Sequence, residues 1–112
     1  MPITQEASGS QTATIGTEHT LATPVTSKTF VANIDCAAMQ ANDYVELKVW
    51  RKVRSVDTLR VVDGRVVSWL EAAVKPIQDM KIVPSGGGEF RVTLRQISGT
   101  GRAFPWSIDT PD

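Results

Sequence analysis

The stretch Thr93–Trp106 reads Thr-Leu-Arg-Gln-Ile-Ser-Gly-Thr-Gly-Arg-Ala-Phe-Pro-Trp and is the most informative part of this 112-residue chain. It begins with the alternation of a strand, breaks at Ser98-Gly99-Thr100-Gly101, and resumes as a short aromatic strand that contains Pro105. It contains no nucleophile–base pair, no set of metal ligands and no phosphate-binding loop. We therefore interpret it as a strand–turn–strand unit that specifies an architecture rather than a catalytic site.

The same period of two recurs along the chain upstream of this stretch. The clearest strand is Tyr44–Val53, in which the aliphatic residues face one way and the charged residues face the other, together with Tyr44 and Trp50. Phe30–Asp35 and Glu89–Ile97 alternate in the same way, and Pro84–Gly88 has the composition of a hairpin loop. Seven or eight short strands separated by Gly, Pro and Asp turns predict an all-β fold, a jelly-roll-like antiparallel β-sandwich.

The middle of the chain is harder to assign. Two β-branched segments, Thr58–Asp63 and Arg65–Ala73, flank Gly64, and this pattern predicts two strands with a turn between them. Glu71–Val74 has some helical character, but its upstream neighbours favour a strand because they are β-branched or aromatic, namely Val66, Val67 and Trp69. We therefore expect strand rather than helix here.

The first quarter of the chain differs in composition from the rest. Residues 1–29 contain eight threonines and few charged residues, and such a segment packs poorly on its own. We predict that residues 1–15 form a flexible, extended N-terminal arm and that residues 16–112 form the β-sandwich domain.

Composition limits the classes of function. A chain of this length forms one domain, and its apolar fraction of 41% supports a hydrophobic core. The 12 Lys and Arg balance the 12 Asp and Glu, which argues against direct nucleic-acid binding by bulk attraction. No apolar run approaches the roughly 20 residues of a membrane helix, and residues 1–11 do not resemble a signal peptide. These features predict a soluble protein made in the cytoplasm.

The residue types needed for catalysis or metal binding are scarce. His19 is the one histidine and Cys36 the one cysteine, so a catalytic triad or a four-ligand zinc site is not expected. Cys36 has no basic neighbour that would lower its pKa, and we interpret it as a buried thiol. Asp35, Asp43 and Glu46 carry oxygen ligands, but their spacing matches no calcium loop. We expect no catalytic residues, no cofactor and no metal.

The outward side chains of Tyr44–Val53 are the best candidates for a binding surface. Trp50 lies on the polar face of this strand by alternation, and basic residues cluster around it. Exposed Trp, Tyr and Arg anchor protein interfaces, whereas an exposed Trp can also stack on sugars. We predict an outward cluster of Tyr44, Trp50, Arg51 and Arg54. From the residues alone, a protein interface and a carbohydrate-binding module remain open as alternatives.

Several segments together resemble a known family. The stretch Thr93–Trp106, with Gly16–Leu21, Val31–Asp35, Met39–Asp43 and Glu46–Val49 upstream, resembles the decoration (cement or staple) proteins of tailed-phage capsids, such as those of epsilon15-type short-tailed phages. The similarity covers roughly residues 16–108.

This resemblance implies a virion protein on the outer surface of an icosahedral capsid, where it clamps neighbouring subunits of the major capsid protein. It also implies a homodimer on the capsid. With no enzymatic motif to transfer, the implied action is stabilisation of the assembled shell by mass action. Extended arms add contacts in such proteins, so we expect the arm residues Ile3–Ile15 to supply a second interface, with Ile3 and Ile15 as its apolar contacts.

Overall fold

The fold is described from a computed structural model, which describes residues 4–22, 29–52, 54, 56–82 and 90–110. These residues contain eight strands and one short helix, and their bounds are β1 Thr4–Thr12, β2 Glu18–Ala22, β3 Phe30–Asp35, β4 Tyr44–Arg51, β5 Arg60–Ser68, α1 Trp69–Val74, β6 Ile77–Ile82, β7 Phe90–Ser98 and β8 Ala103–Thr110.

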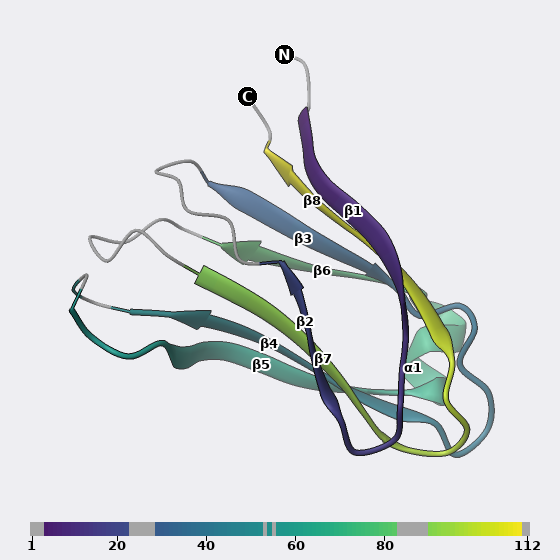
Figure 1. Ribbon diagram of the computed structural model, residues 1–112. Helices are drawn as coiled ribbons and strands as arrows, with labels where there is room; N and C mark the ends of the chain where they lie inside the picture. The colour runs from purple at the N-terminus through teal and green to yellow at the C-terminus, as the bar shows by residue number, and fades with distance from the viewer. Residues whose placement is uncertain (1–3, 23–28, 53, 55, 83–89, 111–112) are drawn as a thin grey trace.

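The strands form two four-stranded antiparallel sheets that pack face to face (Figure 1). Sheet A has the order β1-β8-β3-β6 and sheet B the order β2-β7-β4-β5. Successive strands thus alternate between the sheets, apart from β4 and β5, which form a hairpin. This order is the double Greek key of an eight-stranded jelly roll. The predicted jelly-roll-like sandwich is confirmed.

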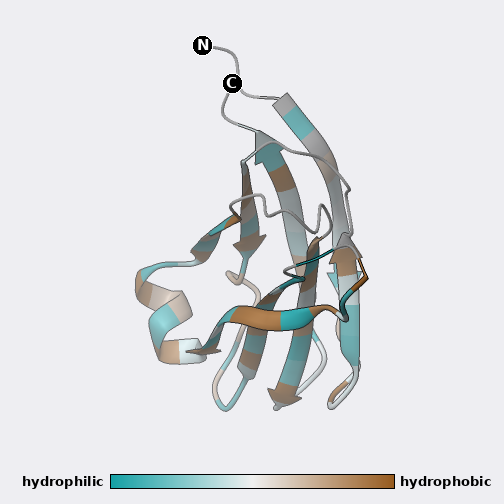
Figure 2. Ribbon diagram, turned by 90° about the vertical axis from the view of Figure 1, so that its left-hand side faces the viewer, coloured by the Kyte–Doolittle hydropathy of each residue, from teal (hydrophilic) through white to brown (hydrophobic). Residues whose placement is uncertain are grey.

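The core lies between the sheets and follows the strand alternation. Figure 2 shows apolar and polar segments alternating along the strands. Val45, Leu47 and Val49 of β4 are at most 1% exposed, while the residues between them face solvent on the outer side of sheet B. Sheet A supplies inward side chains that meet them, among them Phe30, Ala32, Ile34, Met80, Phe104 and Ile108.

The segment that we expected to be an N-terminal arm contributes a strand to sheet A. Residues 4–12 form β1, which pairs with β8 from Thr4 opposite Thr110 to Thr12 opposite Ala103. The residues of β1 are mostly polar and show no apolar alternation, so the sequence pattern did not reveal a strand that pairs with β8 through its backbone. The Trp106 ring packs over Gly9, where an added Cβ would lie 3.2 Å from the indole. The expected boundary at residue 15 therefore does not separate an arm from the sandwich.

Two expectations about residues 58–73 were wrong. Gly64 does not form a turn, because β5 runs through it without interruption. The strand ends at Ser68, where a capping box starts α1: the Ser68 hydroxyl accepts from Glu71 N at 3.2 Å, and the Glu71 carboxylate lies 3.4 Å from Ser68 N. These reciprocal bonds satisfy free N–H groups of the first turn, and they outweigh the strand preference of the preceding valines.

The sharp loop between β7 and β8 is built around the carboxylate of Asp43. Asp43 is fully buried and ends the connection between β3 and β4. Its oxygens accept hydrogen bonds from Gln40 N at 2.8 Å, Thr100 N at 3.0 Å and Arg102 Nε at 2.7 Å. Its backbone carbonyl accepts from Trp69 N at 3.1 Å. The side chain and the backbone carbonyl of one residue therefore join three segments at the end of the sandwich where α1 begins.

The glycine and glutamine of the opening stretch serve this same loop. Gly99 has a φ of 92°, and a Cβ there would overlap the Asp43 carboxylate, so only glycine fits. The buried amide of Gln96 donates to the carbonyls of Ser98 and Thr100 and accepts from Arg102 N. The unusual residues of Thr93–Trp106 thus serve to form the β7–β8 loop, in agreement with the strand–turn–strand unit expected from the sequence.

We predict that Asp43→Asn lowers the free energy of unfolding by about 3 kcal/mol, because it leaves Arg102 beside a neutral group in a buried site. Burial alone would raise the pKa of Asp43, but the bonds from Gln40, Arg102 and Thr100 outweigh it and hold that pKa below its ordinary value. The carboxylate therefore stabilises the fold fully above its unfolded pKa of about 3.9, and this stabilisation is lost as the pH falls through the lower folded value.

Urea titrations of the parent and Asp43→Asn chains from neutral pH down to acid would measure both effects. The stability gap between them should narrow below about pH 4. Asp109→Asn, a partly exposed carboxylate of β8, serves as the control. A gap that stays constant to low pH would contradict the role given to the Asp43 charge.

A second prediction concerns Cys36, which is fully buried beside Asp35. Burial, with a smaller contribution from the Asp35 charge, raises the pKa of the thiol to about 12, so almost no thiolate exists at neutral pH. A thiol reagent should therefore label the folded chain only as fast as it unfolds, and it should label the urea-unfolded chain at once. Rapid labelling of the folded protein in buffer would refute this assignment.

Candidate interaction surface

The outer face of sheet B carries a connected set of polar side chains around Trp50. On β4, Glu46, Lys48 and Trp50 point outward because the alternating valines and leucine point into the core. The register places Lys48 opposite Thr93 of β7, and Glu18 of β2 lies opposite Arg95. We call the set the Trp50 network, and its members are Glu18, Glu46, Lys48, Trp50, Thr93 and Arg95.

Hydrogen bonds fix the orientation of the indole. Trp50 Nε1 donates to Thr93 Oγ1 at 3.0 Å, and the Thr93 hydroxyl donates to Glu18 Oε2 at 2.6 Å. Thr93 is only 3% exposed, so the hydroxyl that both bonds share is shielded from water. A short bond to a carboxylate is charge-assisted and stronger than a neutral one. The half-buried Trp50 ring is therefore held in one position before any partner arrives.

Lys48 connects the ring to the ion pairs of this face. Lys48 Nζ lies 3.4 Å from Glu46 Oε1 and 3.9 Å from Glu18 Oε2, and it sits 5.5 Å from the centroid of the Trp50 ring. A cation at this distance from an indole is attracted by the negative face of the ring. Arg95 Nη2 lies 3.1 Å from the same Glu46 oxygen, although that contact lacks the alignment of a hydrogen bond. The charges of the network are thus balanced internally.

The structure does not bring the predicted outward cluster together. Tyr44 lies at the opposite end of β4 from Trp50, six residues or about 20 Å away, and packs edge-to-face on Trp69 with ring centroids 5.3 Å apart. Arg51 lies on the same face of β4 as the inward-facing Val49, and it is opposite Phe90. Arg54 is exposed beyond the strand and pairs with Asp57 at 2.8 Å. Only Trp50 of these four belongs to the network.

Of the two arm residues proposed as contacts, the structure describes Ile15, which is not a member of the Trp50 network. Ile15 is 41% exposed in the turn between β1 and β2, and Ile3 lies outside the described residues. Sequence reasoning missed Glu18 and Thr93, because their roles depend on the register of β2 and β7 with β4. Alternation alone shows which side a residue faces and not which residue lies beside it.

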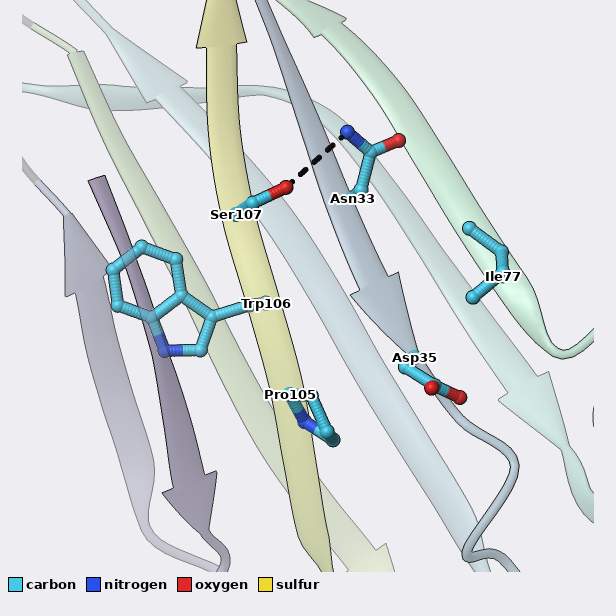
Figure 3. Close-up of a pocket in the computed structure, with 6 residues that line it drawn as sticks. All are labelled: Asn33, Asp35, Ile77, Pro105, Trp106 and Ser107. Carbon is cyan, nitrogen blue, oxygen red and sulfur yellow. Dashed lines mark hydrogen bonds between the residues drawn. The ribbon is translucent and has the colours of Figure 1, made fainter. Parts of the chain in front are cut away.

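The outer face of sheet A carries an open hollow of about 230 Å³. It is lined by Asn33, Asp35, Ile77, Pro105, Trp106 and Ser107. Figure 3 shows the Asn33 amide directed at Ser107 and the Trp106 ring turned away toward β1. Asn33 Nδ2 also donates to Asp109 Oδ2 at 3.0 Å. Because its polar groups bond to each other, this hollow offers little to orient a small ligand.

The other residues considered for chemistry have local roles. His19 of β2 accepts a hydrogen bond from Thr14 N at 3.2 Å, in the turn that precedes this strand. Asp35 accepts from Ala37 N, and Asp43 is engaged inside the loop described above. In the part of the chain that the structure describes, no three His, Cys, Asp or Glu side chains are grouped so as to hold a metal ion.

We predict that Thr93→Val frees the Trp50 indole and lowers the free energy of unfolding by about 1–2 kcal/mol, because it removes two shielded hydrogen bonds without changing side-chain shape. Tryptophan fluorescence should shift as Trp50 becomes more mobile, and the shift should vanish in a Trp50→Phe background. Thr20→Val, an exposed neighbour opposite Thr93 in the register, is the matched control. If the two valine substitutions had equal effects on stability and fluorescence, Thr93 would not be what holds the indole in place.

Comparison with known proteins assigns no family to this chain. No protein-family model matches the sequence, and neither a curated protein nor a solved structure matches it. Among the described residues, no helix combines the length and the apolar character needed to cross a bilayer. What the structure shows is the fold: the described residues form an antiparallel β-sandwich of eight strands with one short helix.

Proposed function

We propose that this protein is a structural virion component that binds the outer surface of an icosahedral phage capsid and stabilises it by clamping neighbouring major capsid subunits. The observation that supports a binding role most directly is the Trp50 network, a fixed indole surrounded by balanced charges on a broad sheet face. A surface ordered in advance loses little conformational entropy on docking, and Trp is among the residues that contribute most to protein interfaces. The partner follows from the resemblance of Thr93–Trp106 to capsid decoration proteins.

The mechanism is thermodynamic. A protein that binds the assembled shell, and not its free subunits, stabilises the shell by mass action, and many copies multiply a modest gain per site. The ion pairs of the Trp50 network also limit the desolvation penalty, since each charge keeps a partner when water leaves. The charge balance of the network suits a mixed polar surface on the partner rather than a strongly acidic one.

Binding to shells tests the proposal. Purified protein should co-sediment with capsids that lack it and should raise their rupture temperature. Trp50→Ala should weaken binding by about tenfold or more, as expected for an interface anchor. Tyr44→Ala, an aromatic substitution at the far end of the same strand, should leave binding close to that of the parent chain. Absence of co-sedimentation, or an unchanged rupture temperature of saturated shells, would refute the role.

A carbohydrate-binding module is the alternative that Trp50 supports. Sugars stack on a free indole face, but Lys48 already lies over one face of this ring at 5.5 Å. A sugar would have to displace that cation or use the other face, and for this reason we favour a protein partner. A glycan array with parent and Trp50→Ala protein separates the two, because a Trp50-dependent glycan signal without capsid binding would favour the module.

A further inference from the structure

Strand β5 forms an open edge of sheet B. It pairs with β4 on one side, and no other strand in the described part of the chain pairs with its second side. The strand is nine residues long, and Val61, Val62 and Val66 are all exposed. A long apolar edge offers unpaired backbone groups to another chain, and proteins usually cover or blunt such edges.

Gly64, at the middle of this edge, is not required by the fold of one chain. Its φ is not in the left-handed region, and an added Cβ would make ordinary contacts, 3.6 Å from Leu47 O and 3.7 Å from Lys48 Cγ. Glycine within a strand lowers stability by roughly 0.5–1 kcal/mol relative to alanine. Such a glycine often marks a place where another backbone approaches closely.

The sequence around Gly64 is complementary to itself. The strand reads Arg60-Val61-Val62-Asp63-Gly64-Arg65-Val66-Val67-Ser68. When two antiparallel copies pair with Gly64 opposite Gly64, Asp63 of each lies opposite Arg65 of the other, and Val62 lies opposite Val66. Opposite charges and β-branched pairs directly across a ladder both stabilise it. Asp63 has no side-chain partner among the described residues, whereas Arg65 reaches Gln78 at 3.3 Å.

We propose that β5 is the interface for a second copy of this chain, in a two-fold dimer whose axis passes beside Gly64. The two sheets B then join into one continuous sheet, and each copy uses the same patch, as a two-fold interface requires. Past the ladder, the Arg60 end of one strand runs toward the Ser68 end of the other, so the β4–β5 connection of one copy adjoins α1 of its partner. These segments carry exposed apolar side chains, including Val56 at 81% and Leu70 at 64% exposure.

The β5 bulge sets the strength of this association. The β4–β5 register slips between Val49 and Trp50 and leaves Val62 without a partner on β4. A bulge bends its strand, so the two-fold ladder is short and ends where Val62 of each copy meets Val66 of the other. An interface of this size belongs to the weak, reversible class. The proposal does not depend on capsid binding.

Cross-linking tests the axis directly. Residues opposite each other in an antiparallel pair have Cα atoms about 4.5–5.5 Å apart, within the range of a disulfide. Gly64→Cys should therefore form an intermolecular disulfide under mild oxidation, and the space beside Gly64 allows the substitution. Arg60→Cys is the control, because two copies of residue 60 would lie about 26 Å apart. Equal cross-linking of both variants, or none in Gly64→Cys, would overturn the proposal.

Charge exchange tests the register independently. In sedimentation equilibrium the parent chain should associate as the concentration rises into the high micromolar range. Asp63→Arg and Arg65→Asp should each weaken dimerisation by about tenfold, and the double variant, which restores opposite charges across the axis, should recover it. Gln78→Ala removes the intrachain partner of Arg65 and should leave the dimer intact. A double variant no better than the single ones would refute the pairing. Neither experiment uses capsids, so its failure is distinct from that of the proposed function.

Discussion

The buried carboxylate of Asp43 is the constraint on which most of this structure depends. It joins the β3–β4 connection, the β7–β8 loop and, through its backbone carbonyl, the start of α1. Tyr44 follows it directly and lies opposite Ser98, so the bond to the loop lies at the end of the β4–β7 ladder. The register shifts by one residue after Tyr44 and then places Lys48 beside Thr93 in the Trp50 network. A buried charge is costly unless it is fully satisfied, and here three donors satisfy it.

The sequence allowed the sandwich and its core to be predicted because strand alternation reports burial directly. It could not reveal β1, since Thr, Ser and Gln show no apolar period when a strand is held mainly through its backbone. The end of β5 was also misjudged: the pair Ser68 and Glu71 forms a capping box only if the chain turns there. The alternation of side chains along the strand predicted that Trp50 points outward, but it could not identify the partners Thr93 and Glu18. Register between distant strands is a property of the whole sheet, and local patterns do not carry it.

The two surfaces proposed here occupy different parts of sheet B. The Trp50 network spans β2, β7 and β4, whereas the proposed dimer uses the free edge of β5. Pairing across that edge keeps the outer faces of both copies on the same side of the joined sheet. A dimer would therefore present two Trp50 networks in one layer. Two linked weak sites on a repetitive surface bind far more tightly than either alone, provided that their spacing matches.

The pairing of β1 with β8 has a consequence for how the chain folds during synthesis. Among the strands that the structure describes, β1 is made first and its sheet partner β8 is made last, with Thr4 opposite Thr110 and Thr12 opposite Ala103. Sheet A also places β8 between β1 and β3, so it cannot close until β8 has been made. Contacts so distant in sequence form slowly. The polar character of β1 then has a clear benefit, because a strand that must wait for its partner is safer in water when it exposes threonine and serine than when it exposes valine.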